Sequence, residues 1–488
     1  MPKLHILPGD RVLTAAENEN LLAALRSGGI FPDAPCGGNG ICGKCRMIVD
    51  GHEVLACRTE ICRDMTVAIP EGAQLQVLQE GKTGASAMSP AKEGYLLAVD
   101  VGTTSVVCYL LDGKTGEELA QSSMLNPQVA FGADVVSRIQ AALRGEMEKL
   151  TNLIRDAVTS LIRKVCEDAG IRPDQISVVS LVGNPAMQQI FFGIEPKNLA
   201  AIPFAPVLTE AKTTSCAEYL PICPDADLLV VPDICGYIGA DTIGCILATR
   251  LHQAEEMTLL VDIGTNGEMV LGNRERLVAC ATAAGPALEG AGITFGMRAA
   301  PGAIDHVWAE DGQVRYSVIG GVEAKSICGS GLVDAVRVAL ELDCVNRRGR
   351  IQSQNLVIPI ADKVYLTQED IRQVQLAKGA IRAGILLMAK ELGIGVEKIQ
   401  KVQLAGAFGN YLDPQSACRI GLLPEELLER IEPVGNAAGS GAKLLACDRN
   451  LLPMTEKLAK QVAFLELASL PDFSRTFAEG MYFREDTP

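Results

Sequence analysis

The sequence has few aromatic residues and lacks any long hydrophobic run. Only one of its 488 residues is Trp, and Phe, Trp and Tyr together make up 4%. A bilayer span needs about 20 consecutive apolar residues, and the best candidate, 228–249, is interrupted by Asp233 and Asp241. The first residues, MPKLHILPGDRV, contain no apolar signal core. We therefore expect a soluble, cytoplasmic protein with no membrane partner.

Basic residues are in the minority. The chain carries 44 Lys and Arg against 59 Asp and Glu, a net charge of −15. A surface of this sign argues against nucleic acid and anionic membrane as main partners. Hydrophobic residues make up 48% of the chain, which at this length is enough for two to four domains with separate cores.

The composition changes along the chain. Residues 1–80 predict short strands near 3–7, 46–49, 53–56 and 66–69, with a helix near 20–27. Residues 81–94, GKTGASAMSPAKEG, have the small and polar composition of a linker. From Tyr95 onward, apolar strands alternate with helical stretches, a pattern typical of α/β domains with buried parallel strands.

An internal repeat divides the second region. LLAVDVGTTS (96–105) resembles LLVDIGTNGE (259–268), and VVSLVGNPAM (178–187) resembles KVQLAGAFGN (401–410). The two pairs occur in the same order. We therefore predict two homologous α/β halves facing a cleft, with boundaries at 95–255 and 256–488.

Five of the 16 cysteines fall between residues 36 and 62. Cys36, Cys42, Cys45 and Cys57 form C-x5-C-x2-C-x11-C, with glycines that let the chain wrap closely and aim N–H groups at sulfur. Three crowded cysteines and one distant one are typical of a 2Fe–2S loop. Zinc, which favours two C-x2-C pairs, is the alternative metal, and Cys62 is an alternative fourth ligand. The other eleven are expected to be small buried hydrophobes because disulfides are rare without secretion.

Two turns rich in glycine and hydroxyl groups follow strands that end in an acid. Asp100-Val-Gly-Thr-Thr-Ser105 and Asp262-Ile-Gly-Thr-Asn-Gly-Glu268 each expose N–H groups to a phosphate, and each acid is placed to hold Mg²⁺ or the attacking water. The Walker lysine motif is absent, which excludes a P-loop. The candidate catalytic residues are Asp100, Asp262 and Glu268. The candidate ATP-binding residues are Gly102, Thr103, Thr104, Gly264, Thr265, Asn266, Gly329, Gly331, Gly406 and Gly409.

Residues 1–75 resemble 2Fe–2S ferredoxins, which implies an α+β, ferredoxin-like β-grasp domain. The later segments resemble the actin/sugar-kinase/Hsp70 ATPases, which implies a duplicated α/β fold with ribonuclease H-like halves and the cofactors ATP and Mg²⁺. One family joins both parts, the reductive activators of corrinoid proteins. Its likeness extends to NPQVAFGADVVSRI (126–139), GNPAMQQIFFGI (183–194), GADTIGC (239–245), AAGPALEGAGITFGMRAAPGAI (283–304) and VGNAAGSGA (434–442).

This resemblance implies that ATP drives one electron from the cluster to cobalt(II) in a corrinoid protein and so restores cobalt(I). It also implies an upstream electron donor and a homodimer. Two departures stand out. The short linker suggests a compact form without the middle domain of the longest members, and Gln188 and Gln189 replace a His that relatives often carry.

Other functions stay open at this stage. They are a plain electron carrier with an inactive ATPase fold, an activator of radical dehydratases, a small-molecule kinase and a redox-sensing regulator. Both acids, Asp100 and Asp262, argue against the first. Dehydratase activators hold their cluster within the ATPase and not in a ferredoxin head, and the scattered Cys235 and Cys328 leave that alternative open.

Overall fold

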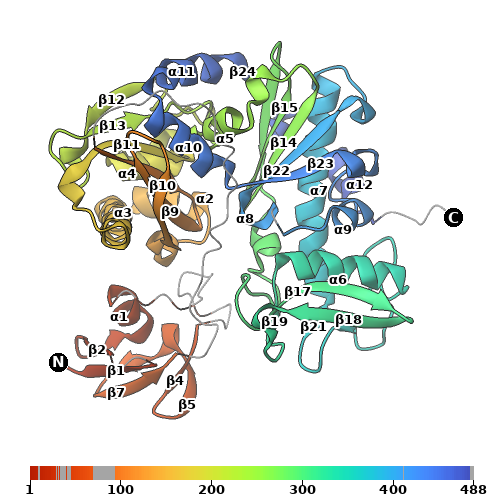
Figure 1. Cartoon of the computed structure of the whole chain (residues 1–488). Coiled ribbons are helices and arrows are strands. Elements are labelled where there is room, and N and C mark those ends of the chain that lie inside the picture. The colour runs from red at the N-terminus through yellow and green to blue at the C-terminus, as the bar shows by residue number, and fades with distance from the viewer. Residues whose placement is uncertain are drawn as a thin grey trace.

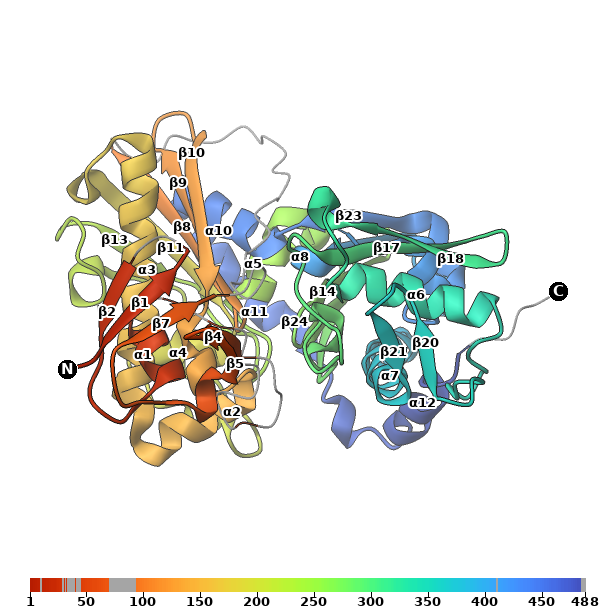
Figure 2. The ribbon, with the colours of Figure 1, turned by 90° about the horizontal axis from the view of Figure 1, so that it is seen from below.

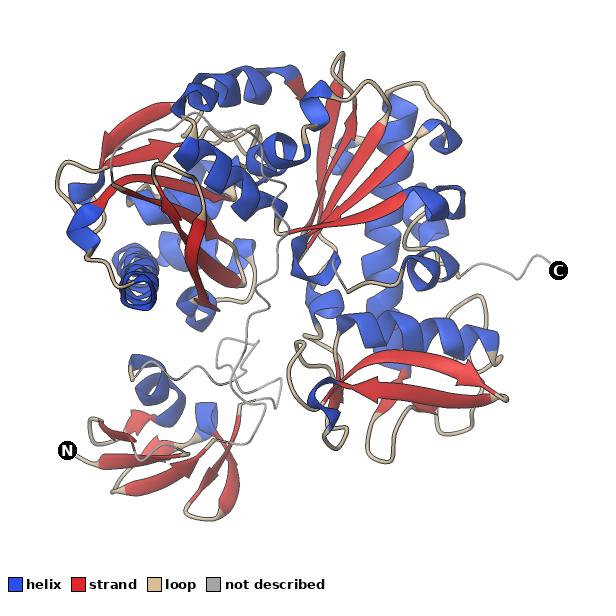
Figure 3. Ribbon diagram, viewed as in Figure 1, coloured by secondary structure: helices blue, strands red, loops and turns tan. Residues whose placement is uncertain are grey.

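A computed structural model describes residues 1–8, 11–28, 30, 32, 40, 45–69, 94–409 and 411–483. It shows a small head at the N-terminus and two larger α/β halves (Figures 1 and 3). The predicted linker lies outside the described residues except for Gly94. Among the described residues, no helix is both long and apolar enough to span a membrane.

The head is a five-stranded sheet crossed by one helix. Its strands are β1 (Lys3–Leu7), β2 (Arg11–Thr14), β4 (Arg46–Val49), β5 (His52–Leu55) and β7 (Met65–Ala68), in the order β2-β1-β7-β4-β5, with α1 (Leu21–Ser27) and the short β3 (Glu19–Asn20) and β6 (Glu60–Ile61). β1 and β7 are parallel, and the other neighbours are antiparallel. Leu4, Leu21 and Val67 are among its fully buried side chains. The predicted β-grasp fold is confirmed.

The first half is built on a six-stranded sheet. β8 (Tyr95–Val101), β9 (Ser105–Asp112), β10 (Glu118–Leu125), β11 (Ile176–Gly183), β12 (Lys212–Ser215) and β13 (Asp227–Val230) lie in the order β10-β9-β8-β11-β13-β12. Apolar residues of α2 (Val135–Ala141), α3 (Met147–Ala169) and α4 (Pro185–Phe192) cover one face of this sheet. Every residue of β8 from Leu96 to Val99 is fully buried, as expected for a strand covered on both faces.

The second half repeats this topology. β14 (Thr258–Ile263), β15 (Gly267–Gly272), β16 (Leu277–Thr282), β22 (Lys401–Ala405), β23 (Ile431–Gly435) and β24 (Val462–Phe464) lie in the order β23-β22-β14-β15-β16-β24. β8 pairs antiparallel with β9 and parallel with β11, and β14 pairs antiparallel with β15 and parallel with β22. The repeat read from the sequence is therefore a repeat of topology, and the predicted duplicated fold is confirmed.

The C-terminal chain returns to the first half. After β23, α10 (Ala437–Cys447) and α11 (Leu452–Gln461) join α5 (Ala240–Thr249) in one hydrophobic core with residues of both sheets, such as Leu96 of β8 and Val270 of β15. These helices lie between the two sheets in Figure 1. The two halves are therefore held together by a shared apolar layer.

An additional small unit extends the second half. It contains the sheet of β17 (Ala303–Glu310), β18 (Gln313–Val318) and β19 (Ser326–Ile327), then α6 (Gly329–Glu341) and the hairpin of β20 (Val357–Pro359) and β21 (Tyr365–Thr367). The long α7 (Gln368–Glu391) follows, with α8 (Gly406–Gly409), α9 (Pro414–Arg419) and α12 (Phe473–Gly480) later in the chain. Figures 1 and 2 show α6 lying beside β17 and β18.

Candidate nucleotide cavity and cluster site

A cavity of about 240 Å³ lies where the two halves meet. It is lined by the turn after β8, the turn after β14, the start of α6 and the start of α8. The sequence-predicted residues that line it are Asp100, Gly102, Thr103, Thr104, Asp262, Gly264, Thr265, Asn266, Glu268, Gly329 and Gly406. The tertiary fold thus brings together two turns that are 162 residues apart in the sequence.

Gly331 and Gly409 do not line the cavity. A Cβ on Gly331 would lie 2.3 Å from the Ile304 carbonyl oxygen, and a Cβ on Gly409 would lie 3.3 Å from Leu404. Both glycines serve close packing. Gly406 is different, because its φ is +87° and a Cβ there would lie 2.7 Å from Oδ1 of Asp262, so only glycine fits beside that carboxylate.

The first turn is held in place by side chains of the segment 126–139 and by Asn184. Asn126 Nδ2 donates to the Gly102 carbonyl at 2.8 Å. Arg138, which is fully buried, donates through Nη2 to the Thr103 carbonyl at 2.5 Å. Asn184 Nδ2 donates to Oγ1 of Thr103 at 2.9 Å. The turn is therefore fixed before any ligand arrives.

Hydroxyl groups of the two turns meet across the cavity. Oγ1 of Thr104 and Oγ1 of Thr265 lie 3.0 Å apart. Both also donate to Oε2 of Glu289, at 3.1 and 3.3 Å. Thr104 belongs to the first half, whereas Thr265 and Glu289 belong to the second, so this contact joins the halves at the phosphate turns.

Carboxylates dominate the electrostatics of the cavity. Asp100, Asp241, Asp262, Glu268 and Glu289 all line it. Burial, opposed by a hydrogen bond from Asn436, raises the pKa of Asp100 to about 6, and burial likewise raises the pKa of Asp262 to about 6. Burial and the neighbouring acids raise the pKa of Asp241 to about 7 and that of Glu268 well above its usual range. A divalent cation bound among these carboxyl groups would stabilise their ionised forms and lower their pKa values.

The cavity also includes residues that sequence reasoning did not select as site residues. Asp241 lies in the first turn of α5. Asn436 precedes α10 and donates to Oδ2 of Asp100 at 2.8 Å. Phe408 and Tyr411 add aromatic surface. Cys245 does not line the cavity, but its thiol donates to Oδ2 of Asp262 at 3.6 Å. Asp241 and Asn436 fall in the family-like segments GADTIGC and VGNAAGSGA, which were the available signal.

These residues fit a nucleotide with Mg²⁺. Within the described ranges no group of three or more His, Cys, Asp and Glu residues is arranged to hold a metal ion alone. Mg²⁺ in nucleotide sites usually takes one or two carboxylates together with phosphate oxygens and waters. Two acid-bearing turns facing one another provide that arrangement.

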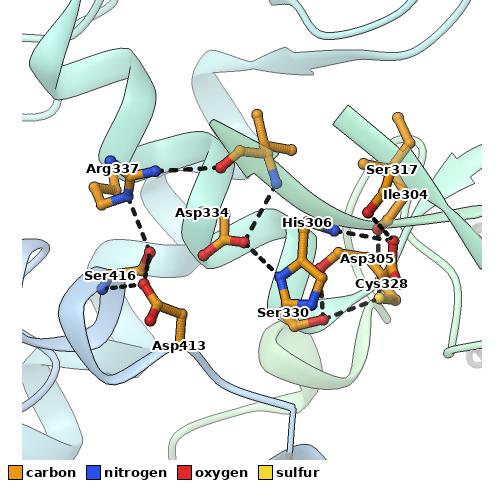
Figure 4. A network of polar contacts seen from close by, with 11 residues as sticks. Ile304, Asp305, His306, Ser317, Cys328, Ser330, Asp334, Arg337, Asp413 and Ser416 are labelled. Atoms are coloured by element: carbon orange, nitrogen blue, oxygen red, sulfur yellow. Dashed lines mark hydrogen bonds and ion pairs between the residues drawn. The ribbon is translucent and has the colours of Figure 1, made fainter. Parts of the chain in front are cut away.

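The wall formed by the start of α6 is fixed by a polar network (Figure 4). Ser330 Oγ donates to the Asp305 carbonyl at 2.9 Å, and Cys328 Sγ donates to the Ile304 carbonyl at 3.4 Å. Further along α6, Asp334 Oδ2 lies 3.1 Å from His306 Nδ1. Arg337 Nε donates to Ser416 Oγ at 3.0 Å. The contacts tie α6 to β17 and α9, which supports the wall and leaves Ser330 bonded to backbone.

Two of the four predicted cluster ligands lie among the described residues. The Cys57 N–H donates to Cys45 Sγ at 3.4 Å, and Cys45 is fully buried. Hydrogen bonds to the ligand sulfurs are one of the features that set the reduction potential of an iron–sulfur cluster. Cys62 is exposed and contacts Asn18 and Glu60 instead. Cys36 and Cys42 lie outside the described residues.

A hairpin precedes Cys57 and joins β4 to β5. Asp50 and Gly51 have φ values of 50° and 85°, which is the type I′ geometry favoured for two-residue hairpins. His52 begins β5 and is exposed.

Comparison with known proteins places the chain. Three family models match it: a 2Fe–2S iron–sulfur cluster binding domain over residues 4–68, the RACo middle region over 95–254, and the C-terminal ASKHA domain of RACo over 256–488. The corrinoid activation enzyme RamQ of Eubacterium limosum is 35% identical over 421 residues, covering 80% of this chain and 71% of that protein. The chain belongs to the RACo family.

Two further comparisons agree with the RACo assignment. The [Co(II) methylated amine-specific corrinoid protein] reductase of Methanosarcina barkeri is 27% identical over 433 residues, covering 81% of this chain and 78% of that protein. A solved structure of a reductive activator for a corrinoid, iron–sulfur protein superposes with a TM-score of 0.73 and 26% identity, covering 99% of this chain and 98% of that one.

The RACo match corrects one expectation. A compact form without the middle domain was expected because the linker is short, but residues 95–254 match the family's middle region. In the structure these residues form the first α/β half. The family's middle region is therefore present in this chain, as the first of its two α/β halves.

Proposed function

We propose that this protein restores cobalt(I) in a corrinoid protein by passing one electron to cobalt(II), and that ATP drives the transfer. The observation that carries the proposal is the joining, in one chain, of a ferredoxin head to a carboxylate-lined cavity between two ATPase-like halves. The relatives named as corrinoid activation and corrinoid reductase proteins support it.

The head holds the electron carrier. Cys36, Cys42, Cys45 and Cys57 are the proposed ligands, and the Cys57 N–H lies against the Cys45 sulfur. When bound, the 2Fe–2S cluster supplies a one-electron couple, with plant-type potentials near about −400 mV. An acceptor 100 mV lower opposes the transfer of one electron by about 2.3 kcal/mol, and this deficit is what ATP must offset.

Different residues of the cavity have different proposed roles in binding and hydrolysing ATP. The turns at Thr103–Thr104 and Gly264–Asn266 present N–H and hydroxyl groups to the phosphates. Asp100, oriented by Asn436, holds Mg²⁺ directly or through water. Asp262 positions the water that attacks the terminal phosphorus, and Glu268 and Glu289 are the alternatives for that role. The base lies near Gly406, beside Phe408 and Tyr411.

ATP binding is proposed to close the two halves. The Thr104–Thr265–Glu289 contact already spans them, and phosphates placed between the two turns would engage both halves at once. Closure then changes how the protein docks on the corrinoid partner, and hydrolysis resets the cycle. An upstream electron donor, a homodimer and a cytoplasmic location complete the proposal.

The deciding experiment uses anaerobically reconstituted protein. We would mix it with a cobalt(II) corrinoid protein and a strong reductant, and follow cobalt(I) by visible absorbance with and without ATP. Expected is ATP-dependent cobalt(I) that is lost in Cys42→Ala. Cys62→Ser is the matched control, because Cys62 is an exposed thiol of the same head, and it should retain both cluster and activity.

The same assay separates the competing functions. An intact cluster with no nucleotide binding would indicate a plain electron carrier. ATP turnover and an intact cluster, without cobalt(I) from several corrinoid partners, would contradict the proposal and point to another low-potential acceptor or to a redox-sensing regulator.

A further inference from the structure

A second, smaller cavity lies beside the nucleotide cavity. Its volume is about 30 Å³, and it is lined by Pro32 of the head together with residues of both halves, including Arg138 and Met297. Four residues line both cavities: Thr104, Thr265, Glu289 and Arg298. These four side chains therefore form the wall between the nucleotide cavity and the head.

Among the residues that the structure describes, Arg298 is the single basic one in the lining of the nucleotide cavity, which also contains five acids. Its Nη1 is buried and has no hydrogen-bond partner within the described part of the chain. An unsatisfied guanidinium N–H is costly to bury. A ligand that supplies an anionic oxygen at this position would remove that cost.

The neighbouring cation, Arg138, already has hydrogen-bond partners within the protein. Arg138 donates to the carbonyls of Gly132 and Thr103 and to the Gln128 side chain. Burial lowers the pKa of Arg138 to about 9, and the positive charge of Arg298 adds to this effect. Two guanidinium groups close enough to repel one another favour an anion beside them. Arg298 is the one of the two that lines the nucleotide cavity.

This inference rests on the proposed function. We infer that Arg298 binds the terminal phosphate of ATP and passes the presence of that phosphate to the head across the smaller cavity, which Arg298 and Pro32 both line. The phosphate turns place Thr104 and Thr265 in the same wall, so Arg298 lies on the phosphate side of the cavity. ADP lacks the terminal phosphate and leaves Arg298 without this partner. The conformation or dynamics of the head should therefore differ between the ATP-bound and the ADP-bound protein.

Nucleotide selectivity tests the first part. We would compare the full-length wild type with Arg298→Gln and Arg298→Lys, measuring Kd for Mg²⁺–ADP and for Mg²⁺ with a non-hydrolysable ATP analogue. Arg298→Gln should weaken the ATP analogue on the order of 10- to 100-fold, as for loss of a charged hydrogen bond, with ADP affinity unchanged. Arg298→Lys should recover part of the loss. Arg315→Gln is the control, because Arg315 is exposed and paired with Glu310 at 3.1 Å.

Hydrogen exchange tests the second part. In the wild type, the ATP analogue and ADP should give different exchange at the amides of residues 45–58 of the head. In Arg298→Gln this difference should vanish even at saturating analogue. An unchanged ratio of ATP to ADP affinity, or a head that still distinguishes the nucleotides in Arg298→Gln, would overturn the inference. Neither readout uses a corrinoid, so failure of the cobalt assay would leave this test intact.

Discussion

At the scale of single residues, the concentration of acid at the nucleotide cavity sets the chemistry. Asp100, Asp262 and Glu268 come from strand ends and strand starts that face one another. Their carboxylates are buried, so each holds its proton more tightly than in water. A base with a pKa near the working pH is the most effective in proton transfer, which suits Asp262 to activating water.

Asp262→Asn should lower kcat for ATP hydrolysis by about 10²- to 10⁴-fold, the usual contribution of a general base, because the amide cannot accept the proton of the attacking water. Steady-state phosphate release by the anaerobic holoprotein measures this. Glu256→Gln, an exposed acid just before β14, should leave kcat unchanged. Full turnover in Asp262→Asn would transfer the role to Glu268, which Glu268→Gln would then show.

Asp241→Asn should stabilise the nucleotide-free protein, and more at pH 8 than at pH 5. Burial raises the pKa of Asp241 from 3.8 to about 7. Between those values the folded chain holds a proton that the unfolded chain releases, so stability falls as pH rises and the cost is complete above about pH 7. Asn removes the charge and this cost. Thermal unfolding followed by circular dichroism at both pH values checks it, and an equal Tm change at both would contradict it.

Some site residues were readable from the sequence and others were not. Asp100 and Asp262 precede Gly-Thr turns, so their local sequence identifies them. Arg298 and Asn436 have no such local signature, because each becomes part of the site only when loops from distant segments converge. Gly331 and Gly409 show the opposite error: the local sequence predicted them as ATP-binding residues, but they do not line the cavity. Small residues in a turn indicate close approach, but the sequence does not say whether backbone or ligand makes it.

At the scale of elements, the start of α10 links helix capping to the proposed Mg²⁺ site. Asn436 Oδ1 accepts from the Gly439 N–H at 2.7 Å, and Nδ2 donates to Asp100 at 2.8 Å and to the Tyr109 hydroxyl at 3.2 Å. One side chain therefore caps the helix and orients the acid proposed to hold Mg²⁺.

Asn436→Ala should lower stability by about 1 kcal/mol through loss of the cap, and should also raise the pKa of Asp100, since the bond from Asn436 lowers it. The acidic limb of the Mg²⁺–nucleotide affinity profile would then move to higher pH. Asn436→Ser keeps a capping oxygen but lacks the amide donor, so it should restore stability without restoring the profile. Titrations of nucleotide affinity between pH 5 and pH 8 measure this, and identical profiles for the two variants and wild type would contradict it.

Gly441→Ala should destabilise the protein by about 1–3 kcal/mol, the cost of overpacking. A Cβ on Gly441 of α10 would lie 2.1 Å from the Gly244 carbonyl oxygen of α5, so the two helices must separate. Ser440→Ala is the control on the same helix, because Ser440 Oγ is buried without a hydrogen-bond partner within the described ranges. Chemical denaturation distinguishes them, and equal midpoints would show that the crossing tolerates a methyl group.

Elements with a local pattern were predicted well. The expected strands at 3–7 and 46–49 coincide with β1 and β4, and those at 53–56 and 66–69 are shifted by one residue. β8 and β14, the strands of the internal repeat, were likewise predicted from their local sequence. The unit of β17–β19 was not assigned, because in β17 and β18 buried and exposed residues do not alternate regularly, and the bulge between Ile304 and His306 breaks the period of two. The return of α10 depends on tertiary packing, which has no local signal.

At the scale of the whole molecule, electron transfer and ATP use should require the same chain. Pro32 of the head lines one cavity with Thr104, Thr265 and Arg298 of the two halves. An equimolar mixture of Cys45→Ser and Asp262→Asn should therefore form cobalt(I) no faster than the two variants measured separately. The cobalt assay with each variant alone supplies the control. Recovery toward the wild-type rate would mean that one chain's head serves another chain's cavity.

The return of α10 also dictates the order in which the molecule becomes complete during its synthesis. The apolar layer between the sheets needs residues 437–458, and β16 gains its outer neighbour only from residues 462–464. While a chain grows on the ribosome, folding generally proceeds from the N-terminus, so the head can fold early. The first half must wait, with the apolar face of its sheet exposed, until almost the last residues emerge. A product that terminates before residue 437 would therefore carry a folded ferredoxin on an open sheet, and would be a substrate for chaperones and proteases.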